Sequence, residues 1–169
     1  MSNTVQLICH PSITNNTISV PQTICEGTAP AAIDGTVPAN GAGPGTYLYQ
    51  WRQSSDGVTF QDIAGATGED LPGTPLTAST CYRRQVTSSV CISASNDIEI
   101  TVDPRITSFS IDLPAQGHDT ICTGDAPAQL SGAVEGGLGA YTYNWAASTD
   151  NENFTSLTAT GPSYQPGAL

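Results

Sequence analysis

The amino-acid sequence predicts an all-β protein built from tandem β-sandwich repeats. The chain has 17 glycines and 12 prolines spread over 169 residues, which leaves no long window in which a helix could propagate. Apolar side chains alternate with polar ones over short runs, the pattern of half-buried strands. One aromatic phrase also occurs twice, as TYLYQW at 46–51 and as AYTYNW at 140–145. Such repetition indicates serial copies of one structural unit.

The internal alignment predicts how these copies divide the chain. The segment from Ile13 aligns with the segment from Ile106, and this alignment brings Trp51 onto Trp145. A shorter match places the N-terminal residues over those from Ser95, with Val5 on Ile98 at an offset of 93. We therefore expect three parts: the last strand of a preceding repeat at 1–12, a complete repeat at 13–104, and a second repeat without its final strands at 105–169.

The complete repeat is expected to contain about seven short strands, each bounded by clusters of Gly, Pro, Asn or Ser. This number of strands in about 90 residues fits an immunoglobulin-like sandwich. The predicted strands cover residues 15–20, 24–33, 46–53, 58–63, 68–71, 80–87 and 96–102.

Alternation within these strands predicts the core. Residues two apart on a strand share a face, so the aromatic side chains of each stripe should pack together. The expected core aromatics are Tyr49, Trp51, Tyr82, Tyr143 and Trp145. Arg84 shares a face with Tyr82 and Val86, so its stem should pack near the core edge, and Arg83 should point to the opposite face.

The composition excludes several classes of partner and chemistry. With 15 acidic and 4 basic residues the net charge is -11, a field that repels nucleic acid and anionic membranes. No apolar run approaches the roughly 18 residues of a membrane span. No paired carboxylates, nucleophile elbow or nucleophile beside a histidine stands out, so no enzymatic activity is expected.

Metal binding is also not expected. Five cysteines are widely separated without a CxxC pair, which favours disulfides in an oxidising compartment over zinc or iron-sulfur sites. An odd number leaves at least one thiol without an intrachain partner. The runs DGVTFQD and TDNENF place oxygen ligands in loops where calcium could bind, but Asp56 followed by Gly57 is better explained as a hairpin turn. No cofactor is therefore expected.

The combination of TICEGTAP, YLYQWRQSSDGVTFQDIAGAT, CYRRQVTSSVC and SNDIEITV resembles the tandem immunoglobulin-like or PKD-like repeats of very long Bacteroidota surface proteins. These include gliding-motility-associated adhesins exported by the type IX route. The resemblance implies an extracellular location at the cell surface and a disulfide between Cys25 and Cys91. It leaves Cys9, Cys81 and Cys122 unpaired or bonded to another chain. The triplet DTI resembles the O-glycosylation motif of the same bacteria, which makes Thr120 a candidate.

These observations lead to one expected function and two alternatives. The expected function is a non-catalytic structural and adhesive module, a stiff spacer whose partners are neighbouring repeats, other copies of the protein, or surface glycans. The first alternative is a self-assembling filament subunit, in which the apolar strand of Val5, Leu7 and Cys9 completes a neighbouring copy. The second alternative is a carbohydrate-binding accessory domain of a secreted hydrolase, with Trp51 or Trp145 as sugar platforms.

Overall fold

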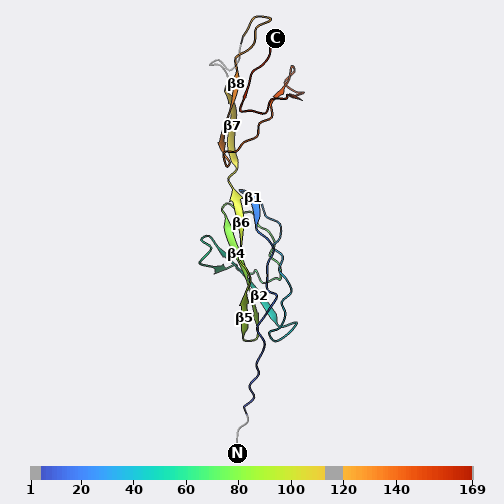
Figure 1. Cartoon of the computed structure of the whole chain (residues 1–169), viewed down its shortest axis with the longest axis vertical. Helices are drawn as coiled ribbons and strands as arrows, with labels where there is room; N and C mark the ends of the chain where they lie inside the picture. Colours follow the sequence, from blue (N-terminus) through green and yellow to red (C-terminus); the bar gives the residue numbers. More distant parts are fainter. Residues whose placement is uncertain (1–4, 113–119, 169) are drawn as a thin grey trace, which may run out of the picture. The chain divides into compact units, whose positions relative to one another are not determined.

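The structure, a computed structural model, describes residues 5–112 and 120–168. Within these ranges every regular element is a β-strand, so the protein is all-β as predicted. The chain divides into two compact units, Met1–Asp103 and Pro104–Leu169, which are called unit 1 and unit 2. Figure 1 shows their strands in order along the chain.

Unit 1 is organised around one sheet of six strands. Its order is β1-β6-β4-β2-β3, and β5 pairs with β4. All neighbours are antiparallel except β1 and β6, which run parallel. The strands are β1 (Gln22–Cys25), β2 (Tyr47–Ser54), β3 (Gln61–Asp62), β4 (Thr80–Ser88), β5 (Cys91–Ala94) and β6 (Ile98–Asp103).

The pairing of β2 with β4 sets the inner face of this sheet. Tyr49 lies opposite Val86 and Trp51 lies opposite Arg84. Along β4, alternate residues from Tyr82 to Ser88 are buried, whereas those between them are half-buried. This alternation follows from the two-residue period of a strand, and it was predicted correctly. The core cluster contains Ile18, Ile33, Trp51, Tyr82, Ile98 and Ile100.

The layer facing this sheet is less regular than the sequence predicts. The expected strands at 15–20 and 68–71 are reduced to isolated bridges between Ile18 and Gly35 and between Ile33 and Leu71. Asn15 has φ 55°, a left-handed conformation that interrupts an extended run. Ile18 and Ile33 are buried, whereas Val20 is 75% exposed. Period-two patterning therefore found part of the buried face but not the continuity of the hydrogen bonds.

Strand β5 was not predicted. Ser89, with φ 54°, turns the chain after β4, and Cys91 then pairs with Ser88. The two turn residues, Ser89 and Val90, carry none of the Asn-Gly or Gly-Gly signals of tight hairpins. β5 and β6 pair with different parts of β4. β6 pairs with the part that contains Tyr82, which lies opposite Ile98.

Unit 2 contains a three-stranded sheet and a short ribbon. The sheet has the order β11-β8-β7 and is antiparallel. Its strands are β7 (Ile106–Asp112), β8 (Leu130–Gly136) and β11 (Ser163–Tyr164), and the ribbon pairs β9 (Ala146–Ala147) with β10 (Thr155–Ser156).

The two units share a tryptophan anchor. The indole Nε1 of Trp51 donates to the carbonyl of Gly68 at 3.0 Å, and that of Trp145 donates to Gly161 at 2.9 Å. Each tryptophan carbonyl in turn accepts from an amide twelve residues later, that of Ile63 at 2.9 Å and of Leu157 at 2.8 Å. The repeated sequence phrase therefore folds into the same local structure in both units.

Candidate functional site

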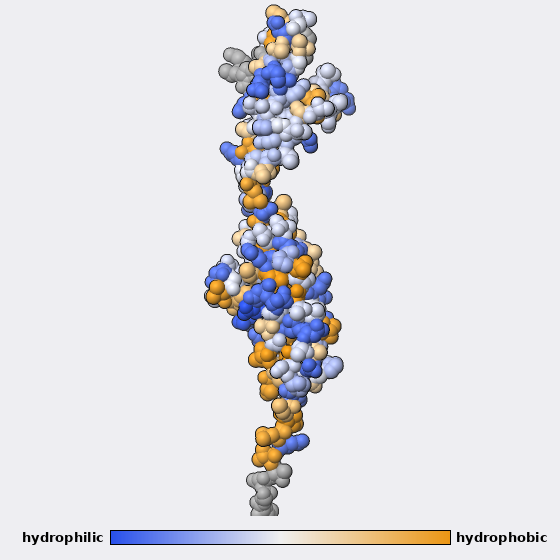
Figure 2. Space-filling model, viewed as in Figure 1, coloured by the Kyte–Doolittle hydropathy of each residue, from blue (hydrophilic) through white to orange (hydrophobic). Residues whose placement is uncertain are grey.

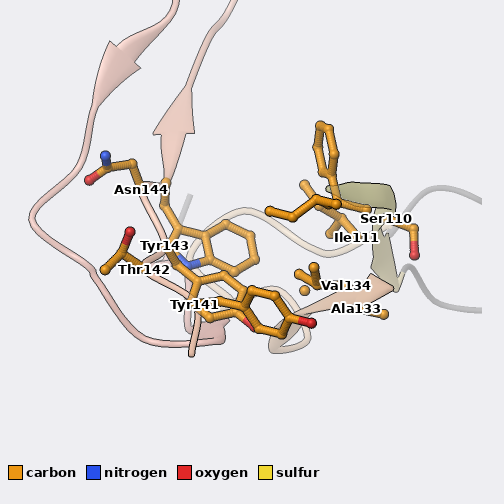
Figure 3. A pocket seen from close by; sticks show the side chains of 12 residues that line it. Ser110, Ile111, Ala133, Val134, Tyr141, Thr142, Tyr143 and Asn144 are labelled. Carbon is orange, nitrogen blue, oxygen red and sulfur yellow. The ribbon is translucent and has the colours of Figure 1, made fainter. Parts of the chain in front are cut away.

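An open apolar groove in unit 2 is the candidate functional site. It has a volume of about 250 Å³ and lies between the sheet of β7 and β8 and the segment 141–145. We call it the unit-2 groove. Figure 3 shows Tyr141 and Tyr143 turned toward Ile111 and Val134, whereas Thr142 and Asn144 point away. The lining residues are Ile106, Phe109, Ser110, Ile111, Gly132, Ala133, Val134, Tyr141, Thr142, Tyr143, Asn144 and Trp145.

The aromatic wall of the groove is held in place by ring contacts and hydrogen bonds. The rings of Tyr141 and Tyr143 meet edge to face with centroids 6.4 Å apart, and Trp145 lies 5.7 Å from Tyr164. The Tyr141 hydroxyl donates to the carbonyl of Gly136 at the end of β8. These contacts fix three aromatic residues on one face of the segment. The aromatic side chains of this wall are thus held in place by contacts within unit 2.

The opposite wall is unusually exposed for apolar residues. Phe109 is 80% exposed, Ile106 55% and Ile111 48%. All three lie on β7, and they were not predicted as site residues. A signal was present in the sequence: in the internal alignment Phe109 replaces Asn16, so an apolar residue stands where unit 1 has a polar one.

Unit 1 shows what fills the equivalent space. There the aromatic strand β2 pairs with β4 along its whole length. The buried face of β4 carries Tyr82, Arg84, Val86 and Ser88, and the last three are completely buried. Among the described residues of unit 2, no strand pairs with 141–145. In unit 2 the side chains of Tyr141, Tyr143 and Trp145 line the groove instead.

Of the five predicted core aromatics, the most buried are Trp51 at 0%, Tyr82 at 5% and Trp145 at 7%. Tyr49 and Tyr143 are half-buried. Burial also raises the pKa of Tyr82. Neither tryptophan presents an open face to a sugar, because both rings are buried.

Arg84 occupies the centre of unit 1. Its Nε and Nη2 donate to Oδ1 of Asn16 at 3.2 and 3.0 Å, its Nη1 donates to the carbonyl of Glu69 at 2.8 Å, and Nη2 also donates to Thr36 at 2.7 Å. Burial lowers the pKa of this guanidinium. Arg83 points to the other face, as predicted, where it pairs with Asp97 at 2.6 Å.

The predicted disulfide between Cys25 and Cys91 is wrong for this structure. Cys25 lies beside Asp103 at one end of the sheet, and Cys91 pairs with Ser88 at the other end of β4 (Figure 1). At about 3.3 Å per residue, the nine residues of β4 alone separate the two by far more than the roughly 7 Å that a disulfide tolerates. All five cysteines lie in the described ranges, and all are free thiols.

The remaining cysteines differ in exposure. Cys9 and Cys122 are exposed, whereas Cys81 is half-buried. Desolvation raises the pKa of the Cys81 thiol, and the nearby carboxylates of Glu99 and Asp97 raise it further. Cys81 is therefore the least reactive of the three.

The predicted strand-exchange residues and the glycosylation candidate are accessible. Val5 is 79% and Leu7 93% exposed, and Cys9 is also exposed. Figure 2 shows the hydrophobic residues of this segment gathered next to the grey N-terminal residues. Thr120 is exposed, and Asp119 of the same triplet lies outside the described residues.

The acidic loops organise turns. Oδ1 of Asp56 accepts from the Ser54 hydroxyl at 2.6 Å and from the amides of Val58 and Thr59 at 2.8 and 2.7 Å. These hydrogen bonds hold the pKa of Asp56 far below its ordinary value. Asp150 makes the equivalent turn in unit 2, with the same effect on its pKa.

Metal ligands do not gather in the described part of the chain. Among residues 5–112 and 120–168, no three His, Cys, Asp or Glu side chains are close enough to hold a metal ion. Within the same ranges, no helix is long and apolar enough to cross a membrane.

A comparison with known protein families identifies the family of this chain. A protein-family model described as domain of unknown function DUF8696 matches residues 14–104 and 114–169. The chain belongs to this family. The first matched segment ends one residue past the boundary between the two units, and the second lies within unit 2. No curated protein matches the chain.

Proposed function

We propose that the chain is a non-catalytic structural and adhesive module of a long extracellular surface protein, in which serial β-domains act as a stiff spacer. The observation that carries this proposal is the connection between the units. β6 ends at Asp103 and β7 begins at Ile106, so only Pro104 and Arg105 lie between two strands. Pro104 also has one backbone angle fixed by its ring.

Both ends of this connection are hydrogen-bonded within their own units. The carbonyl of Asp103 accepts from the amide of Glu26 at 2.9 Å, and the carbonyl of Arg105 accepts from the amide of Gly137 at 3.0 Å. A linker this short, with both flanking carbonyls bound, has little freedom to bend. Stiffness is the property that a spacer requires.

The filled core of unit 1 favours the spacer function over carbohydrate binding. Trp51, Val86 and Ile100 are completely buried, and they leave no exposed aromatic row on β2. Adhesion would then come from many weak contacts along an array, because multivalency strengthens binding without a deep pocket in each repeat. The surface location is supported by the sequence resemblance. The high acidity favours the solubility of such an array.

NMR relaxation tests the spacer directly. We expect the two units of the native chain to tumble with one rotational correlation time. A control with four residues, Gly-Ser-Gly-Ser, inserted between Pro104 and Arg105 should give two shorter, separate times. If the native chain already behaves like the insertion variant, the connection is flexible and the spacer proposal fails.

A glycan array tests the carbohydrate alternative. The spacer predicts no saturable binding by the single chain. Saturable glycan binding by the native chain would favour the accessory domain if it is lost in Phe154→Ala, whose ring is 60% exposed. The matched control is Trp51→Phe, which alters a buried ring.

A further inference from the structure

We propose that unit 1 carries a weak binding site for a neutral N-acetylated sugar beside the hydroxyl of Tyr82. The site consists of two pockets, one apolar and one polar, and the side chain of Gln53 lines both of them. We call it the Tyr82 site. The proposal deepens the adhesive role proposed above and rests on it, because it names the class of ligand that each weak contact of an array would recognise.

The hydroxyl of Tyr82 is a polar group without a partner in the protein. The side chain is only 5% exposed, yet its hydroxyl makes no hydrogen bond to any described residue. In the described part of the chain, no fully enclosed side-chain nitrogen or oxygen lacks a partner, so this hydroxyl is open to the pocket that Tyr82 lines. Burial raises the pKa of Tyr82, so the hydroxyl keeps its proton. It is therefore left for water or for an acceptor atom of a ligand.

The pocket at Tyr82 is small, mainly apolar and held in shape. Its volume of about 70 Å³ suits a methyl group beside a carbonyl better than a sugar ring. Ile33 and Leu71 join two of its walls, since each amide donates to the other residue's carbonyl, at 2.9 and 3.0 Å. Gly73 packs so closely on Pro30 that a Cβ would overlap the Pro30 carbonyl. The walls thus need no rearrangement to receive a ligand.

The second pocket is polar and larger, with a volume of about 230 Å³. Gln53 of β2 and Gln61 of β3 lie opposite each other, and neither side-chain amide is hydrogen-bonded to a described residue. Amide and hydroxyl side chains can both donate and accept, as the hydroxyl groups of a sugar require. The lining consists of Gln53, Ser54, Ser55, Thr59, Gln61 and Thr80.

The two linings together favour a neutral ligand with one apolar and one polar part. No charged side chain lines either pocket, so an ionic ligand would meet no counter-charge. A purely apolar ligand would leave the amides of Gln53 and Gln61 and the Tyr82 hydroxyl without partners. In an N-acetylated sugar, the acetyl methyl fits the apolar pocket, the acetyl carbonyl accepts from Tyr82, and the ring hydroxyls face the two glutamines.

The Tyr82 site should bind weakly. Tyr82 is the one aromatic residue in the two linings, so little stacking on the sugar ring is available. For a ligand of about 15 non-hydrogen atoms in an open site, we expect a Kd of about 1 mM. A single chain with this affinity gives no saturable signal on a glycan array, whereas many repeats together would adhere. The site therefore agrees with a spacer that attaches through many weak contacts.

An NMR titration of the full chain with N-acetylglucosamine measures this binding. Chemical shifts should saturate near about 10 mM sugar and be largest around Gln53 and Tyr82. Glucose, which lacks the acetamide group, should bind at least about tenfold more weakly. Acetamide alone should also bind more weakly, because it has no ring hydroxyls for the polar pocket. Acetamide binding as tight as that of the sugar would overturn the assignment to a sugar.

Two tyrosine variants separate binding from folding. Tyr82→Phe removes a hydroxyl that bonds to no described residue, so it should weaken sugar binding about five- to tenfold without lowering Tm. Tyr47→Phe is the matched control. Its hydroxyl donates to the carbonyl of Asn40 at 2.9 Å, so its loss should lower Tm slightly and leave sugar binding unchanged. General destabilisation of unit 1 cannot produce this opposite pattern.

A glutamine pair tests the polar pocket in the same way. Gln53→Ala should weaken sugar binding about threefold or more, whereas Gln85→Ala should not, because Gln85 lies on the other face of β4 from Tyr82. The proposal is overturned if the native chain shows no saturable shifts up to about 20 mM sugar. It is also overturned if Tyr82→Phe binds as tightly as the native chain. Neither result changes the tumbling of the two units, so the spacer and the Tyr82 site can fail separately.

Discussion

Replacing Arg84 by alanine should destabilise unit 1 far more than replacing its neighbour Arg83. The Arg84 guanidinium is completely buried and donates to Asn16, Glu69 and Thr36. Arg84→Ala leaves three acceptor groups without their donor. Each buried group left unsatisfied costs about 1 kcal/mol or more, so the hydrogen-bond loss alone is about 3 kcal/mol.

Lost contacts with the aromatic rings add to this cost. The Arg84 guanidinium carbon lies 5.1 Å from the centroid of Tyr49 and 5.9 Å from that of Trp51. A cation over an aromatic ring contributes about 0.5 to 1 kcal/mol. The expected total is therefore about 4 kcal/mol, without counting the cavity that the shortened side chain leaves.

Arg83 is the matched control, because it lies next in sequence and also binds through its guanidinium. It pairs with Asp97 at 2.6 Å and covers the ring of Phe60 at 4.1 Å, but its side chain is 31% exposed. Exposed ion pairs contribute less than about 1 kcal/mol. Arg83→Ala should therefore cost no more than about 1 to 2 kcal/mol, including the ring contact.

Urea unfolding measures the difference. Trp51 reports on unit 1, and a Trp145→Phe background removes the fluorescence of unit 2. With a slope of about 1.3 kcal/mol per molar urea, Arg84→Ala should lower the midpoint by about 3 M, and Arg83→Ala by about 1 M. Should Arg84→Ala fail to fold, Arg84→Lys can be measured instead. It keeps the positive charge but lacks the planar guanidinium donors, so it should lower the urea midpoint by an intermediate amount. Equal midpoints for the two alanine variants would refute the reasoning.

Three further predictions concern a turn, a close approach and a thiol. Because hydrogen bonds depress the pKa of Asp56 in the folded state, its contribution to stability is present above pH about 4 and is lost as the pH falls further. Asp56→Asn keeps the acceptor oxygen and should flatten the decline of Tm between pH about 4 and about 2; an unchanged decline would contradict this. A Cβ at Gly35 would overlap the Arg84 guanidinium and lie 2.6 Å from the Glu69 carbonyl, so Gly35→Ala should lower Tm, whereas an unchanged Tm would show that the core can yield. In thiol labelling of the folded chain, Cys81 should react more slowly than the exposed Cys25, and equal rates would argue against its burial.

The inner face of unit 1 was largely predictable from sequence. Alternation identified Trp51, Tyr82 and the orientation of Arg84 because side chains on a strand change sides at every residue. That pattern depends on local geometry alone, so no knowledge of tertiary contacts was needed. The repeated phrase likewise predicted that Trp145 would be buried as Trp51 is.

Other features depended on contacts between distant residues. The pairing of Cys25 with Cys91 required knowing which ends of the strands meet, and sequence spacing does not contain that information. Strand β5 was missed because its turn lacks a glycine or asparagine signal. The isolated bridges at Ile18 and Ile33 have strand-like sequences, but their hydrogen bonding is set by how the facing chain runs.

The sequence by itself determined that the protein is all-β and that an aromatic unit occurs twice, whereas residues 5–9 have the apolar pattern of a strand but form none in the structure. Those properties follow from composition and from a two-residue period, which are local. Only the tertiary structure decided that Arg84 is bound by Asn16 and two carbonyls, and that the wall of Phe109 and Ile111 stays open. Each of these depends on which strands become neighbours, and side-chain packing across the whole unit determines that pairing.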